Sequence, residues 1–336
     1  MRSKQTMTIV ILNFRTPEIT INCLKTIAAE VQTTPGIHVI LIDNASGDDS
    51  VPLIKAAILE NHWSASWLEF RPIDTNLGFA GGNNLILREQ LSLASPPEYL
   101  LLLNSDTLVH QGCLATCLKL MEEDSKIGAL SCMLRNRDGS VQNVCRKFPH
   151  PLRESLRALG LPWIMPKLFG WADLEDRGWD REKISRDVDW ISGAFFLART
   201  EMLRKTGLMD EGFFFLGEDC EWCFRIWKNG WRIRFDPSAE ITHLGGASSD
   251  STRVRNRTKD LYTWRARFKV QEKCYGLLAK VWIHSLYLIS FGLRKYWMMA
   301  TGKTGQIAYE GISEGFDQLL HLNEKSGSDQ LSSKAS

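Results

Sequence analysis

The chain has 336 residues, of which 44% are hydrophobic and 24% charged, so it can bury a full core as one large domain with an appendage. Its formal net charge of +2 is too small to indicate general nucleic-acid binding, and no nucleic-acid partner is expected. Eight cysteines at this length lack the density of a disulfide scaffold and are typical of a reducing compartment, so we expect a cytoplasmic protein.

Short β-branched segments alternate with helical ones through the first half of the chain. Strands are expected at 8–12, 39–42, 67–70, 99–103 and 127–133, with helices between them. This order is typical of βαβ units, so we expect an α/β fold with a mostly parallel central sheet flanked by helices. A further strand at 190–197, a helix at 218–228 and two strands at 233–235 and 240–243 complete the expected core.

Residues 150–188 interrupt this regular pattern with spaced prolines and tryptophans, which predicts a loop-rich insertion. Its tryptophans, Trp163, Trp171 and Trp179, are candidates for lining an acceptor groove. We expect the main domain to span 6–250, followed by a basic and amphipathic helical region at 251–324 and a disordered tail at 325–336.

The segment 277–300 is apolar and aromatic, but Lys280, His284, Arg294 and Lys295 interrupt it. It therefore lacks the uninterrupted apolar length of a membrane-spanning helix. Two interpretations stay open: peripheral contact with the inner face of the cytoplasmic membrane, or packing on the core. The basic stretch 253–259 is equally open, as a cover over a diphosphate, a surface for anionic lipid or a solvated charged face.

Polar residues follow three of the expected strands at the point where each strand ends. Asn13 follows the first strand, Asp43 and Asn44 the second, and Asn104-Ser105-Asp106 the apolar run at 99–103. Ligands of open α/β sheets bind beyond the carboxyl ends of the strands, so these side chains are the first candidates for a site.

The sequence resembles the family 2 glycosyltransferases with a GT-A fold, particularly the rhamnosyltransferase-like branch, from Thr8 to about Ser249. Six motifs in order carry the resemblance: Asp43 to Ser46, Asn76 to Asn84, Leu103 to Asp106, Trp190 to Ala194, Gly217-Glu218-Asp219, and His243 with Gly245-Gly246. Each motif alone is weak evidence. Their common order makes the resemblance specific.

The resemblance implies that the strand-end residues hold a nucleotide-sugar donor. Asp43 or Asn44, with Asn13, would accept from the base or ribose, although an Asx-type turn that only shapes the loop is the alternative for Asp43. The glycine-rich segment would set backbone amides near the donor, and a plain tight turn is nearly as good an interpretation. The donor-site residues so implied are Asn13, Asp43, Asn44, Asn76, Gly78, Gly82, Asn83, Asn104, Ser105 and Gly193.

The resemblance also implies a divalent cation, Mn²⁺ or Mg²⁺. Asn104-Ser105-Asp106 stands where the family carries its D-x-D motif, with Asn104 in place of the first acid, and Asp106 is the expected direct ligand. His243 matches the position of the other ligand. A helix-capping role for Asp106 and a hydrogen-bonded core role for His243 are the structural alternatives.

Asp219 matches the carboxylate that serves as general base in the family, whereas Glu218 is better explained as an acid that favours a helix N-terminus. The implied activity is inverting transfer of a sugar, first rhamnose from dTDP and next another hexose from UDP, to a saccharide or polyprenyl-linked acceptor in cell-surface polysaccharide synthesis. A nucleotidyltransferase would carry glycines after the first strand, and residues 13–17 have none. A catalytically silent sugar- or lipid-binding subunit is the rival of another class, motivated by Asn104.

Overall fold

The computed structural model describes residues 6–63, 65–176, 178–213, 216–245, 253–302, 315–317 and 319–320, and only the backbone of 253–262. The chain divides into two compact units. The first unit comprises Met1–Phe148 and Glu175–Asp250, and the second comprises Pro149–Leu174 and Ser251–Ser336. The segment 149–174 was expected within a loop-rich insertion of the main domain, but it groups with the C-terminal helices. The predicted disordered tail at 325–336 lies outside the described residues.

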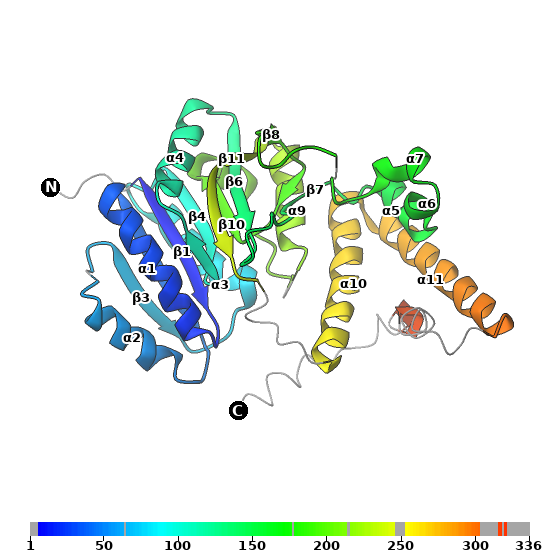
Figure 1. Cartoon of the computed structure of the whole chain (residues 1–336), viewed down its shortest axis with the longest axis horizontal. Helices are drawn as coiled ribbons and strands as arrows, with labels where there is room; N and C mark the ends of the chain where they lie inside the picture. The colour runs from blue at the N-terminus through cyan, green and yellow to red at the C-terminus, as the bar shows by residue number, and fades with distance from the viewer. Residues whose placement is uncertain are drawn as a thin grey trace. The chain divides into compact units, whose positions relative to one another are not determined.

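A nine-stranded sheet forms the centre of the first unit (Figure 1). Its order is β3 (Leu68–Ile73), β2 (Ile37–Asn44), β1 (Met7–Asn13), β4 (Tyr99–Asn104), β10 (Phe195–Arg199), β6 (Ile127–Arg135), β11 (Arg232–His243) and β5 (Thr107–Val109), with β8 (Arg186–Asp187) also on β11. Six of these strands run in one direction, and β5, β8 and β10 run against them. The expected α/β fold with a mostly parallel sheet is therefore confirmed.

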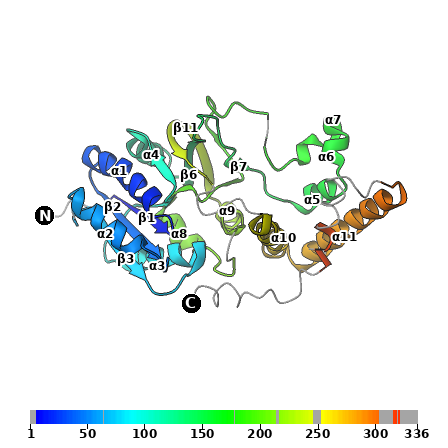
Figure 2. The same cartoon turned by 60° about the horizontal axis from the view of Figure 1, so that its bottom comes forward.

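The central strands form because their sequences are continuous apolar runs. β1 reads MTIVILN and β4 reads YLLLLN, and nearly all of their residues are buried. Such runs suit strands covered by helices on both faces. In Figures 1 and 2, α1 (Pro17–Thr33) and α4 (Cys113–Glu123) lie on one face, and α3 (Gly78–Ser92) and α9 (Glu218–Lys228) lie on the other.

Two further helices and one small ladder complete the first unit. α2 (Ser50–Glu60) links β2 to β3, and α8 (Thr200–Thr206) follows β10. The strand expected at 190–197 is divided, because β9 (Trp190–Ile191) pairs with β7 (Cys145–Arg146) before the chain turns into β10. The two strands expected at 233–235 and 240–243 are one strand, β11, with a register shift after Asp236.

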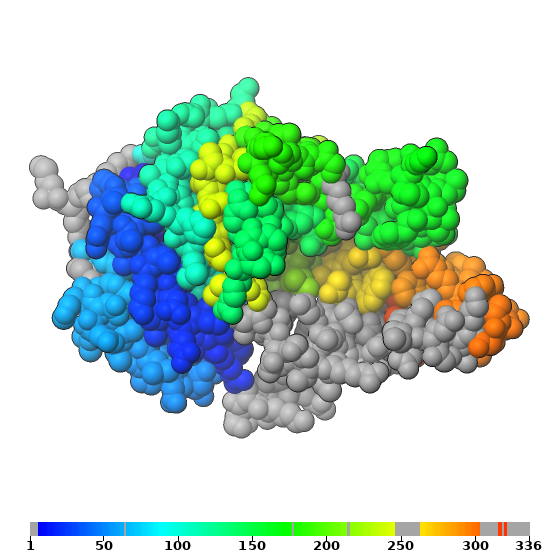
Figure 3. All heavy atoms as spheres, viewed as in Figure 1, coloured from blue at the N-terminus to red at the C-terminus, as the bar shows by residue number. Residues whose placement is uncertain are grey.

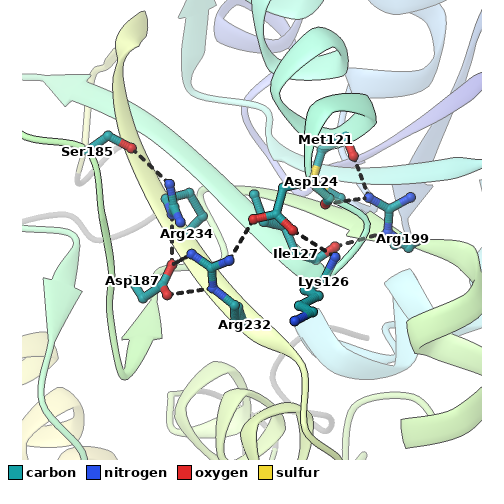
Figure 4. A network of polar contacts seen from close by, with 9 residues as sticks. All are labelled: Met121, Asp124, Lys126, Ile127, Ser185, Asp187, Arg199, Arg232 and Arg234. Carbon is teal, nitrogen blue, oxygen red and sulfur yellow. Dashed lines mark hydrogen bonds and ion pairs between the residues drawn. The ribbon is translucent and has the colours of Figure 1, made fainter.

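The amino ends of the parallel strands carry a closed network of charges (Figure 4). Asp187 accepts from Arg232 at 2.6 Å and from Arg234 at 2.7 Å, and Arg232 also reaches Asp124 at 2.6 Å. The Arg199 guanidinium donates to the backbone oxygens of Met121, Asp124 and Ile127. The last carbonyls of a helix have no donor within the helix. Arg199 thereby donates hydrogen bonds to carbonyls around the end of α4.

The second unit is helical in its described residues. It contains α5 (Pro151–Ala158), α6 (Leu161–Ile164), α7 (Pro166–Phe169), a short 3₁₀ turn (Gly170–Ala172), α10 (Arg253–Tyr275) and α11 (Leu277–Ala300). Its core gathers Ala158, Phe268, Ile283, Tyr287 and Leu319. Buried Glu154 accepts from the Tyr287 hydroxyl at 2.9 Å and lies 3.6 Å from Arg267, so its charge is paired. Across the described part of the chain, no helix is long and apolar enough to cross a membrane.

Candidate active site

The sheet register brings the strand-end residues to one edge. Asn13 at the end of β1 pairs with Asp43 near the end of β2, and Leu12 pairs with Asn104 at the end of β4. The Asn104 amide donates to the Ala194 carbonyl at 3.0 Å, which ties the turn before β10 to the same edge. Asn13, Asp43 and Asn104 therefore lie at one edge, at the carboxyl ends of the parallel strands as expected, and the turn that holds Gly193 lies beside them.

Asp43 is used within its own turn. Its carboxylate accepts from the Ser46 amide at 3.0 Å, the Ser46 hydroxyl at 2.6 Å and the Asn13 side-chain nitrogen at 2.7 Å, and the residue is 2% exposed. Arg15 donates to the Ser46 carbonyl from its side chain at 2.9 Å. These are the contacts of the alternative interpretation, a turn-shaping aspartate. A direct bond from Asp43 to the nucleoside stays a prediction.

Asn44 holds the glycine-rich segment to the end of β2. Its side chain accepts from the Leu77 amide at 3.0 Å and donates to the Asn76 oxygen at 3.1 Å and the Gly78 carbonyl at 3.2 Å. Asn76 in turn accepts from the Gly78 amide at 2.8 Å. Gly78 has a φ of 69°, a left-handed conformation that glycine adopts without strain. The segment is therefore a fixed turn that starts α3.

The later glycines of this segment serve helix packing. A Cβ at Gly82 would lie 3.0 Å from the Leu12 side chain, so glycine lets α3 approach β1 closely. Asn83 is buried and donates to the Phe79 carbonyl at 2.9 Å. The direct approach of this segment to a donor, expected for Gly82 and Asn83, stays a prediction.

Asp106 and His243 come together because β5 runs antiparallel to β11. His243 pairs with Thr107 in that ladder, and the Leu244 amide donates to the Asp106 carbonyl at 2.8 Å. The His243 Nε2 atom consequently lies 3.2 Å from Asp106 Oδ1. Ser105 lies in the turn that leads into β5, between Asn104 and Asp106.

Gln142 fixes which nitrogen of His243 carries the proton. The Gln142 amide nitrogen donates to Asn136 Oδ1 and to the His243 carbonyl, both at 2.7 Å, which leaves its oxygen 2.8 Å from His243 Nδ1. In the neutral imidazole Nδ1 then holds the proton, and Nε2 turns a lone pair toward the Asp106 carboxylate. Two lone-pair atoms at this separation are stable only with a cation or a proton between them. The sequence analysis missed Gln142, because its role depends on a contact 101 residues away along the chain.

This pair fits a divalent cation in its chemistry. A carboxylate oxygen and an imidazole nitrogen are ligands that Mn²⁺ and Mg²⁺ accept, with the nitrogen favouring manganese, and the Gln142 amide holds the imidazole in place. Among the described residues, no three His, Cys, Asp or Glu side chains gather at one metal position. Oxygens from outside the protein would have to complete the coordination sphere.

Asp219 stands at the first turn of α9, close to Gly193. Its carboxylate accepts from the Cys220 amide at 2.8 Å, and the Gly193 amide also stabilises its charged form. Burial nevertheless raises the pKa of Asp219. The pKa of neighbouring Glu218 is also raised, to about 8, first by burial and then by the charge of Asp219. A carboxylate with a raised pKa is a stronger base than an ordinary surface aspartate.

Gly193 connects the predicted base to the glycine-rich segment. A Cβ at this position would lie 3.0 Å from the Phe79 ring of α3, so only glycine fits without moving that ring. The same residue lies beside Ala194, which holds Asn104. Gly193 and Ala194 therefore contact the end of β4, the start of α3 and the first turn of α9.

Asn84 is a second residue that the sequence analysis missed. It is fully buried, donates to the Met209 carbonyl at 2.8 Å and accepts from the Met209 amide at 3.2 Å. It also donates to Glu211, which pairs with Arg88. The segment that precedes α9 is therefore clamped to α3. The signal available was that Asn84 lies within a family motif, but its partner could not be read from that.

Residues 4–263 match the family model described as glycosyltransferase like family 2. The chain belongs to this family. As a family 2 member, it is 28% identical over 213 residues to an N-acetylglucosaminyl-diphospho-decaprenol L-rhamnosyltransferase of Mycobacterium tuberculosis (strain ATCC 25618 / H37Rv), a match covering 62% of this chain and 66% of that protein. It is 25% identical over 201 residues to the rhamnosyltransferase WbbL of Escherichia coli (strain K12), covering 57% and 72%. The match to the mycobacterial protein thus spans just under two thirds of that relative.

Solved structures show the same fold for this family 2 chain. A mannosyltransferase from Pyrobaculum calidifontis, in complex with GDP-Man and Mn²⁺, superposes with a TM-score of 0.56 at 15% identity, covering 96% of this chain and 87% of that one. S. aureus TarS 1–349 in complex with UDP-GlcNAc superposes with a TM-score of 0.53 at 13% identity, covering 94% and 81%. The expected GT-A-like fold is confirmed.

Proposed function

We propose that the protein is a metal-dependent, inverting glycosyltransferase that moves a sugar from a nucleotide diphosphate to an acceptor hydroxyl. The observation that carries this proposal is the Asp106–His243 pair. Asp106 Oδ1 lies 3.2 Å from His243 Nε2, and Gln142 holds the other ring nitrogen, Nδ1. Family membership supplies the reaction class. A bound cation would counter the charge that develops on the leaving nucleoside diphosphate. The oxygens of that diphosphate would complete the coordination that Asp106 and His243 begin.

Asp219 is the proposed general base. It takes the proton of the acceptor hydroxyl as that oxygen attacks the anomeric carbon and as the bond from this carbon to the diphosphate breaks. The electron pair of the broken bond leaves with the phosphate oxygen, so the sugar inverts at one centre in one step. Two observations support Asp219: burial raises its pKa, and its carboxylate accepts from the backbone amide of Gly193, a residue that packs against Phe79 of α3.

The names of the relatives support a rhamnose donor and a lipid-linked acceptor. The mycobacterial protein is named as an L-rhamnosyltransferase acting on a lipid-linked amino sugar, and WbbL is named as a rhamnosyltransferase. We therefore keep dTDP-rhamnose as the first donor and a UDP-hexose as the next, with a saccharide or polyprenyl-linked acceptor. A lipid-linked acceptor would place the reaction at the cytoplasmic face of the membrane, with peripheral contact through 277–300.

A thermal-shift titration tests the donor site and the metal together. The purified chain is heated with dTDP, UDP, GDP or CMP, each with and without Mn²⁺, because a ligand that binds only the folded state raises Tm. We expect one diphosphate to stabilise the protein only with metal, and Asp106→Ala to abolish the effect. Asp138→Ala, in the surface turn after β6, is the matched control and should keep it. Absence of any nucleotide shift would contradict the proposal and favour a silent binding subunit.

A further inference from the structure

The exposed face of α11 is apolar instead of polar. Positions three and four residues apart along this 24-residue helix share one face. On that face lie Leu278, Val281, Trp282, Ile289, Leu293, Tyr296 and Trp297, all strongly exposed, with Leu278 at 86%. Ser285 is the one polar residue among them. We call these residues the α11 stripe.

The basic residues of α11 point elsewhere. Lys280 pairs with Glu272 at 2.7 Å, Lys295 pairs with Asp317 at 3.2 Å, and Arg294 donates to the Ala158 carbonyl at 3.3 Å. Each of these partners belongs to the same unit. The helix therefore packs its cations inward and leaves its apolar side chains in contact with water, the reverse of an ordinary surface helix.

A second exposed apolar patch lies on α5 to α7 and the turn after them. It consists of Leu152, Leu159, Trp163, Ile164, Met165, Leu168 and Trp171, with Ile164 at 71% exposure. α5 packs on α11, where the Trp282 indole donates to the Ser155 hydroxyl at 2.9 Å. Both α5–α7 and α11 reach the surface of the second unit in Figure 3. Two segments more than a hundred residues apart in sequence thus expose neighbouring apolar surface.

The net charge of the second unit favours a lipid surface over a second copy of the chain as the partner of these apolar patches. Residues 149–174 and 253–302 hold fourteen lysines and arginines against four aspartates and glutamates. Two copies of so basic a unit repel each other, whereas an anionic lipid surface attracts it. Each apolar patch contains two tryptophans, and the α11 stripe adds Tyr296; both residue types favour the boundary between lipid and water.

We propose that the α11 stripe and the α5–α7 patch together form a docking surface for an anionic lipid bilayer. This goes beyond the contact expected for 277–300 alone, since it assigns half of the surface to the segment that interrupts the catalytic domain. The apolar side chains enter the headgroup boundary, and the net positive charge of the unit attracts the anionic headgroups. The proposal does not depend on the donor, the acceptor or the metal.

Vesicle flotation of the full chain tests the surface. We expect the wild-type protein to float with vesicles of phosphatidylcholine and phosphatidylglycerol at low salt, about tenfold more than with phosphatidylcholine alone, and to lose most of this preference at high salt. Two variants separate the halves: Leu278→Ser with Ile289→Ser and Leu293→Ser, and Ile164→Ser with Leu168→Ser. Each should lower the bound fraction by about tenfold, because each removes exposed leucine or isoleucine side chains from the lipid contact.

Leu53→Ser with Leu59→Ser on α2 is the matched control, since these exposed leucines belong to the first unit. It should float like the wild type. Equal flotation on neutral and anionic vesicles, or retention of binding by both test variants, would overturn the proposal. A wild-type dimer in sedimentation equilibrium that the α11 variant dissociates would also overturn it, because a second copy would then be the occupant. None of these readouts requires sugar transfer, so their failure is distinguishable from failure of the proposed activity.

Discussion

The two edges of the central sheet use similar side chains and leave them in different states. At the amino ends of the parallel strands, Asp187 accepts from both Arg232 and Arg234, and Arg199 donates to three carbonyls. At the carboxyl ends, Asp106 lies 3.2 Å from His243 Nε2, and Asp219 is held beside Glu218, a second carboxyl group. Opposite charges pair at the first edge, whereas at the second the Asp106–His243 pair needs a proton or a cation between its atoms and two carboxyl groups lie side by side.

This difference assigns the two edges of the sheet different roles, stability at the amino ends and function at the carboxyl ends. Paired charges at the amino ends lower the free energy of the folded chain and offer nothing to a substrate. Incomplete polar groups at the carboxyl ends raise that free energy, and a cation, a diphosphate or a proton can complete them. Substitutions at the two edges should therefore change different measurements.

The largest expected effect is on transfer at the carboxyl-end edge. Asp219→Asn should lower kcat by about a hundredfold or more, because the amide cannot take the acceptor proton, while Tm stays within a few degrees. Release of nucleoside diphosphate in the presence of donor and acceptor measures the rate. Glu201→Gln, an exposed carboxyl on α8, is the control and should keep wild-type activity. A variant that transfers sugar at near the wild-type rate would remove Asp219 from the mechanism.

The pH profile of the same reaction gives an independent check of Asp219. The carboxylate must be ionised to act as a base, and burial raises the pKa of Asp219 above its usual range near 3.8. Below that raised pKa, log kcat/KM should fall by about one unit for each pH unit, so the acidic limb lies at higher pH than an exposed aspartate would give. A limb at the pH of an ordinary aspartate would contradict this assignment.

A smaller effect is expected from the residue that orients His243. Gln142→Ala should weaken Mn²⁺ binding by about ten- to a hundredfold, the usual loss when a group that holds a metal-binding histidine is removed, because the imidazole is then free to turn or to exchange its proton between nitrogens. Calorimetric titration of Mn²⁺ into the protein in the presence of excess nucleoside diphosphate measures this affinity. His110→Ala removes a histidine held comparably by Glu240 and Thr242 and serves as the control. Equal affinities in the two variants would leave Gln142 without a role at the metal.

The contrast between the edges also marks what could be read from the sequence. The apolar runs predicted the strands, and the parallel arrangement placed Asn13, Asp43, Asn104 and Asp106 at one edge. The pairing of Asp106 with His243 followed only from the family motifs, since 137 residues separate them. Local sequence offered both a nucleoside-binding and a turn-shaping role for Asp43 and could not decide between them, because the bond from Asn13 comes from the neighbouring strand, 30 residues away.

Long-range packing explains the remaining differences. Nothing in residues 149–174 shows that they belong with helices a hundred residues later, because the contacts of Glu154 with Arg267 and Tyr287 exist only in the folded unit. The three tryptophans that were candidates for lining an acceptor groove are divided between the two units. Trp163 and Trp171 belong to the second unit, whereas Trp179 packs on Phe235 in the first, with ring centroids 5.4 Å apart. Their role in an acceptor groove stays a prediction.

The smallest expected effect belongs to the amino-end edge. Asp187→Asn removes the negative charge that two arginines share, and should lower the free energy of unfolding by about 1 kcal/mol, since these groups are partly exposed and the bonds are screened by water. Thermal or denaturant unfolding measures the loss. Added salt should shrink the difference from wild type, because it screens the ion pairs in the parent protein. Sugar transfer at a temperature where both proteins are folded should not change. A loss of transfer without a loss of stability would show that the two edges are coupled through the strands, and would contradict the separation drawn between them.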